Sequence, residues 1–71
     1  MRKKDVLRYY QAKSGEPAGS RKIILAVAND LGCWPQTVEQ WEEVIPKGRA
    51  YELYVKTNGE IDLNANDYNQ P

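Results

Sequence analysis

Residues 24–43 read ILAVANDLGCWPQTVEQWEE, and the first half of this stretch has the pattern of an amphipathic helix. Gly32 follows that half, at the place where a left-handed helix end costs least. Ser20 precedes it and is a good N-cap, because its hydroxyl accepts a bond from a free backbone N–H. We therefore predict a helix over residues 21–31. Its apolar face is expected to consist of Ile24, Val27, Ala28 and Leu31.

A second short helix is expected after the break at Gly32. Pro35 suits its first turn, since the missing N–H of proline would have no helical partner there. Val38 and Trp41 supply an apolar side. Pro46 disfavours helical backbone at the residue before it, so the helix is predicted to span about residues 35–43.

The residue sizes in this stretch are typical of a helix-turn-helix unit. Ala28 is small where the second helix would cross the first, and Cys33 places a small apolar group under the turn. Val38 and Trp41 would anchor the second helix from below. Such a unit places the N-terminal residues of its second helix on base edges in the DNA major groove. The sequence thus indicates DNA binding, although similar helix pairs also serve structure alone.

The distribution of charge supports a nucleic-acid partner. The net charge of the 71 residues is zero. Residues 1–22 hold seven basic and two acidic side chains, a net of about +5, whereas residues 23–71 hold three basic and eight acidic ones, about −5. Such asymmetry predicts one basic face.

The length allows a single domain over residues 1–71, with a polar, loosely held tail from about residue 64.

The composition argues against other function classes. A single cysteine and the absence of histidine exclude an internal disulfide, a Cys/His zinc site and histidine acid–base chemistry. Nothing resembles a nucleophile–base pair, so we expect no enzyme, no cofactor and no small-molecule substrate. There is no long apolar run and no signal-peptide pattern, so no membrane segment is expected and a cytoplasmic location fits.

The flanks of the central stretch are less uniform. Val6, Leu7 and Tyr10 predict a helix over about residues 3–13, followed by a loop rich in glycine. The last third is ambiguous. Its apolar residues fit a helix, but the alternation of apolar residues around Asn58-Gly59 also fits a β-hairpin at about residues 51–64.

A family resemblance rests on two strings. Residues 41–53 read WEEVIPKGRAYEL, and the chain opens with KKDVL at residues 3–7. Both are similar to the short Cro repressors of lambdoid bacteriophages, in particular the all-helical branch. The resemblance implies an all-α helix-turn-helix domain of four to five short helices, the fourth over about residues 47–57. The alternative is an α+β fold with the C-terminal hairpin. It also implies a repressor that binds double-stranded, palindromic operator DNA as a weak homodimer in a bacterial host cell.

The resemblance and the helix geometry together assign candidate roles. The glutamines would bond adenine edges, the threonine a thymine methyl group, and the glutamate a cytosine amino group or only solvent. The expected base-reading residues are Gln36, Thr37, Glu39 and Gln40. The expected phosphate contacts are Arg21, Lys22, Lys47 and Arg49. The dimer contact is expected among Tyr51, Tyr54, Val55 and Ile61, although some of these must close the monomer core.

Trp34 departs from the family, since a serine or threonine normally caps the recognition helix at this place. We interpret it as a hydrophobic lid over the turn, with contact to sugar-phosphate as the alternative.

Two other functions remain open from the sequence. One is an antitoxin-like regulator of a prophage, and the other is a helix-turn-helix module that binds protein and not DNA.

Overall fold

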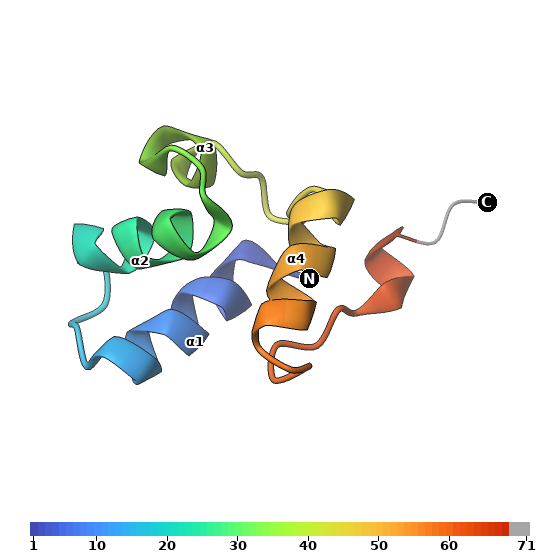
Figure 1. The fold of residues 1–71 in the computed structure, drawn as a ribbon, viewed down its shortest axis with the longest axis horizontal. Coiled ribbons are helices and arrows are strands. Elements are labelled where there is room, and N and C mark those ends of the chain that lie inside the picture. The colour runs from blue at the N-terminus through green and yellow to red at the C-terminus, as the bar shows by residue number, and fades with distance from the viewer. Residues whose placement is uncertain (69–71) are drawn as a thin grey trace.

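The computed structural model describes residues 1–68, in which four α-helices and one 3-10 helix follow one another (Figure 1). These residues form no β-sheet, and their one isolated bridge joins Arg2 to Val44. The all-α prediction is therefore confirmed, and the alternative of a hairpin at residues 51–64 is not favoured. The elements are α1 (Lys3–Ser14), α2 (Arg21–Leu31), α3 (Pro35–Glu39), α4 (Lys47–Lys56) and η1 (Ala65–Tyr68).

Both ends of α2 lie where local chemistry predicts them. The Ser20 hydroxyl accepts a hydrogen bond from the backbone N–H of Lys22 at 3.2 Å. Gly32 ends the helix with a φ of +67°, a conformation that residues with a Cβ rarely adopt. The predicted bounds of this helix are confirmed. The first helix ends one residue later than predicted, at Ser14.

The apolar core lies between α1, α2 and α4 and includes the start of the chain. On α2 the residue that points fully into this core is Ile23, whereas Ile24, which we expected there, is half-buried. Ile23, Val27 and Leu31 are spaced four residues apart and form one stripe, so the buried face is rotated toward Ile23. The buried apolar residues are Met1, Val6, Tyr10, Ile23, Val27, Ala28, Leu31, Val38, Trp41, Ile45, Ala50, Leu53 and Ile61.

Helix α4 occupies the segment with ambiguous local signals. Ala50, Leu53 and Thr57 are buried at helical spacing. The Thr57 hydroxyl donates to the Leu53 carbonyl at 2.8 Å and accepts the N–H of Ile61 at 3.3 Å. Gly59 has a φ of +79° and its N–H donates to the Tyr54 carbonyl at 2.8 Å. The Asn-Gly pair that resembles a hairpin turn therefore closes the C-terminal end of a helix.

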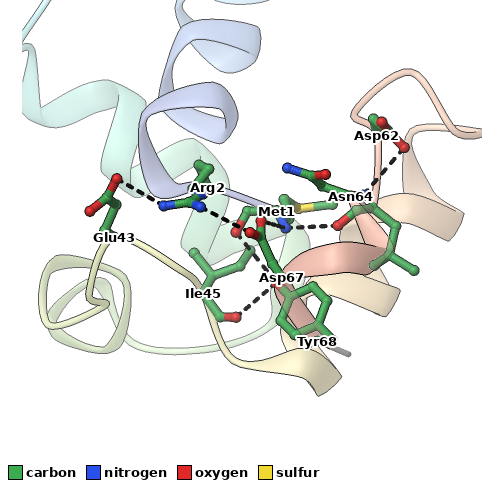
Figure 2. Close-up of polar contacts among 9 residues, drawn as sticks. Met1, Arg2, Glu43, Ile45, Asp62, Asn64, Asp67 and Tyr68 are labelled. Atoms are coloured by element: carbon green, nitrogen blue, oxygen red, sulfur yellow. Dashed lines mark hydrogen bonds and ion pairs between the residues drawn. The ribbon is translucent and has the colours of Figure 1, made fainter. Parts of the chain in front are cut away.

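The segment after residue 63 is fastened to the start of the chain (Figure 2). The Met1 amino group donates to the Leu63 carbonyl at 2.7 Å and to Asp67 Oδ2 at 3.0 Å. Arg2 donates to the other Asp67 oxygen at 3.0 Å, and the Tyr68 hydroxyl donates to the Ile45 carbonyl at 2.9 Å. The expectation of a loosely held tail is therefore wrong for residues 64–68. Its remaining part, residues 69–71, lies outside the described residues.

Acid is expected to weaken this attachment. The hydrogen bond from the Met1 amino group, with a smaller effect of Arg2, lowers the pKa of Asp67. A carboxylate whose pKa is lower in the folded chain than in the unfolded one stabilises the fold above its ordinary pKa of about 3.9. This stabilisation is lost as the pH falls through the lowered value.

Thermal unfolding followed by circular dichroism between about pH 5 and pH 2 checks this. The melting temperature of Asp67→Asn should start lower and fall less over this range than that of the unchanged protein. Asp62→Asn is the matched control, because the exposed Asp62 makes no ion pair within residues 1–68. Parallel pH profiles for the protein and Asp67→Asn would contradict the prediction.

Candidate nucleic-acid interface

Helix α3 is mounted on α2 through small and apolar residues. Ala28 and Val38 are both buried, and the N–H of Cys33 donates to the Ala28 carbonyl at 3.0 Å. Figure 1 shows α3 resting against α2, on the side away from α1. Trp41 is also buried, so the predicted anchors of the second helix are confirmed. The small residue at Ala28 allows the two helices to approach closely.

The second helix is shorter than predicted. It ends at Glu39, with Gln40 as its C-cap, whereas we expected it to continue to about residue 43. The chain turns away because Trp41 enters the core and the following backbone pairs with the start of the chain. The N–H of Lys3 donates to the Glu43 carbonyl at 2.9 Å. The Lys3 ammonium donates to the carbonyls of Glu39 at 2.9 Å and Trp41 at 3.3 Å, which satisfies the open helix end.

The structure places the four predicted base-reading residues on or just after α3. Gln36, Glu39 and Gln40 are exposed, and Thr37 is half-buried. Gln36 lies three residues before Glu39 and four before Gln40, so these three share one face of the helix turn. Thr37 lies beside this face. Gln36, Glu39 and Gln40 therefore face outward as expected, whereas Thr37 does so only in part. Gln40 stands at the helix end and not in its middle.

An ion pair joins two of the predicted site residues. Arg21 Nη1 donates to Glu39 Oε2 at 2.8 Å, so the first residue of α2 is bonded to the last residue of α3. The sequence patterns indicate phosphate contact for Arg21 and base contact or solvent for Glu39, and they give no sign of this ion pair. The two residues are 18 positions apart, and no local pattern signals a contact across a turn.

The other predicted phosphate contacts lie at two helix N-termini. Lys22 is exposed in the first turn of α2 and forms a long ion pair with Glu16 at 3.7 Å. Lys47 is exposed at the first position of α4, and Arg49 pairs with Glu52 at 3.0 Å. Figure 1 shows the chain running from α3 directly to this first turn of α4. Surface pairs of this kind hold a side chain only weakly, so these cations can exchange partners.

Trp34 does not cover the turn. Its side chain is 76% exposed, and it gives α3 no side-chain cap. Cys33, which is free and half-buried, packs against the core in its place. The interpretation of Trp34 as a lid is therefore wrong, because the space under the turn is already filled.

The predicted dimer residues separate into two groups. Tyr51, Tyr54 and Val55 are exposed along one side of α4. A shallow apolar depression on this helix is lined by Tyr51, Glu52, Val55 and Lys56. Ile61 is only 4% exposed and belongs to the core of the monomer. Ile61 is therefore not available for a dimer contact, in keeping with the expectation that some of the four close the core.

A family model described as DNA-binding transcriptional regulator Cro matches residues 23–71 of the chain. This is more than half of its length. The chain belongs to this family. The match covers nearly all of α2 and the whole of α3 and α4, whereas α1 precedes it.

Membership of the Cro family confirms the resemblance inferred from the sequence and identifies the chain as a DNA-binding transcriptional regulator. No curated protein and no solved structure matches the chain significantly. Within residues 1–68, no group of His, Cys, Asp and Glu side chains could hold a metal ion. None of the described helices is long and apolar enough to cross a membrane.

Proposed function

We propose that this Cro-family chain is a repressor that binds a palindromic operator and docks α3 in the major groove. The observation that carries the proposal is the exposed polar face of α3 on a helix pair held together by buried Ala28 and Val38. A helix presented in this way places its outer side chains within reach of base edges. Bound at a promoter, the protein would occupy DNA that the transcription machinery needs.

Each exposed side chain on this face has a matching chemistry. Gln36 and Gln40 have both an amide donor and an acceptor, which together match the N6 and N7 edge of adenine. Thr37 would contact a thymine methyl group. Lys22, Lys47 and Arg49 would bind phosphates on either side of the groove, because they lie at the N-termini of α2 and α4. Because the net charge of the protein is zero, its attraction to DNA would come from these local cations.

DNA binding is tested by electrophoretic mobility shift with an operator selected from random DNA. Affinity should fall roughly 10³-fold between about 50 and 200 mM salt if a dimer neutralises about six phosphates. Gln40→Ala should relax base preference at one position per half-site, whereas Lys47→Ala should weaken binding to all sequences about equally. No shift at micromolar protein and low salt would overturn the proposal and favour a module that binds protein.

A weak homodimer through α4 would match a palindromic site. The exposed side of α4 offers two tyrosines and Val55, which is 69% exposed. A two-fold contact would place this patch against its own copy and bury apolar surface on both chains.

Sedimentation equilibrium of the protein and of Val55→Glu measures this association. The variant should remain monomeric at concentrations where the unchanged protein dimerises, because two carboxylates would face each other. Ala12→Glu on α1 is the control for charge alone, because Ala12 is exposed and lies outside this patch. Equal association of the Val55 variant and the protein would place the dimer contact elsewhere.

A further inference from the structure

The pair of Arg21 and Glu39 lies on the surface that the proposed function turns toward DNA. The side chain of Arg21 is 60% exposed and that of Glu39 is 40% exposed. Because both groups remain hydrated, an exposed pair of this type contributes little to folding. Its main physical effect is therefore local. The bond to Glu39 favours one position of the long arginine side chain without fixing it.

The backbone of the residue that bonds the arginine is held from the protein side. The Glu39 carbonyl accepts the Lys3 ammonium at 2.9 Å, which ties this end of α3 to α1. Glu39 also shares its face of the turn with Gln36 and Gln40. The Arg21 guanidinium, bonded to Glu39, therefore lies next to the base-reading face.

The chemistry of the pair fits one base. A guanidinium has five N–H donors in a planar fork, and one of its nitrogens is bonded to Glu39. The remaining donors match the O6 and N7 acceptors that guanine presents in the major groove. The guanidinium offsets part of the charge of the paired carboxylate, so it repels phosphate less than a free glutamate would.

We infer that Arg21 reads a guanine and that Glu39 is the positioning residue that holds Arg21 for this contact. The inference rests on the proposed function. It replaces two separate roles, phosphate for Arg21 and cytosine for Glu39, with one joint role. It also explains how an acidic residue is tolerated on a surface that meets DNA.

The test measures base discrimination and not affinity alone. A site is first selected from random DNA with the unchanged protein. Each G·C pair in a half-site is then changed to A·T, and the ratio of dissociation constants is measured by fluorescence anisotropy. At one of these pairs the unchanged protein should discriminate by about tenfold. Arg21→Lys and Glu39→Gln should each reduce this ratio toward one at that same pair.

Another pair of an arginine with a glutamate provides the matched control. Arg49 and Glu52 pair at 3.0 Å within α4, away from the face of α3. Glu52→Gln removes the same charge as Glu39→Gln and should leave the ratio unchanged. Thermal unfolding should give similar melting temperatures for both variants. A reduced ratio of dissociation constants in Glu39→Gln then shows that Arg21 is no longer positioned, and not that the protein is unfolded.

Two results would overturn the inference while leaving the proposed function intact. If Glu39→Gln tightens binding to every site and keeps the ratio, Glu39 is only a repelling charge. If Arg21→Lys keeps the ratio at every G·C pair, Arg21 contacts phosphate. A failure of the unchanged protein to bind any selected DNA would instead refute the proposed function, and the inference with it.

Discussion

Replacing Leu53 by alanine is expected to leave a large fraction of the chain unfolded at room temperature. Leu53 has no exposed surface, since α4 closes over the core formed with α1 and α2. Truncating such a leucine costs about 2–5 kcal/mol, because the lost contacts leave a cavity that neighbours fill only in part. A domain of this size is stabilised by only about 3–5 kcal/mol. The loss is therefore comparable with the whole stability.

Urea unfolding followed by the circular dichroism of the helices measures this change. Leu25→Ala is the matched control, because Leu25 on α2 is 44% exposed and the same atoms are removed there. It should cost about 1 kcal/mol or less. A Leu53→Ala midpoint equal to that of Leu25→Ala would show that α4 does not close the core.

Enlarging Ala28 to leucine is expected to separate α3 from α2. Ala28 is buried between the helices, and its carbonyl accepts the N–H of Cys33 in the turn. The added carbon atoms have no space, so either side chains leave their rotamers or α3 moves outward. Overpacking of this kind costs about 1–3 kcal/mol. A displaced α3 would also lose its alignment with base edges, and specific DNA affinity should fall more than about tenfold.

Two measurements separate these effects. Thermal unfolding reports the loss of stability, and mobility shift at a temperature where the variant is folded reports the loss of DNA binding. Ala12→Leu is the control, because Ala12 is exposed on α1 and tolerates a larger side chain. A variant at Ala28 with unchanged melting temperature and operator affinity would contradict the close crossing of the two helices.

The predictable parts of this fold are those with local causes. Ser20 and Gly32 act within one turn of α2, and the bounds of that helix are correct. The exposure of Gln36 and Gln40 follows from their spacing against buried Val38. Much of the candidate DNA-binding surface therefore needs only neighbouring residues to be predicted.

The errors lie where distant segments compete with local preference. Local signals in residues 51–64 fit a hairpin, but burying Ala50, Leu53 and Thr57 on one side of a helix overrides them. The second helix ends early because the chain after Gln40 returns to the N-terminus. Trp34 is exposed because Cys33 already fills the space that a lid would cover.

The helix-turn-helix unit could be predicted from local sequence, because caps, a turn glycine and apolar spacing act over a few residues. Three features depend on how the helices pack: the length of α3, the half-buried Asp67 contact with Met1 and Arg2, and the pairing of Arg21 with Glu39. Each of these joins residues at least 18 positions apart in the chain or depends on such contacts. Their partners are selected by packing of the helices, which no local pattern of residues encodes.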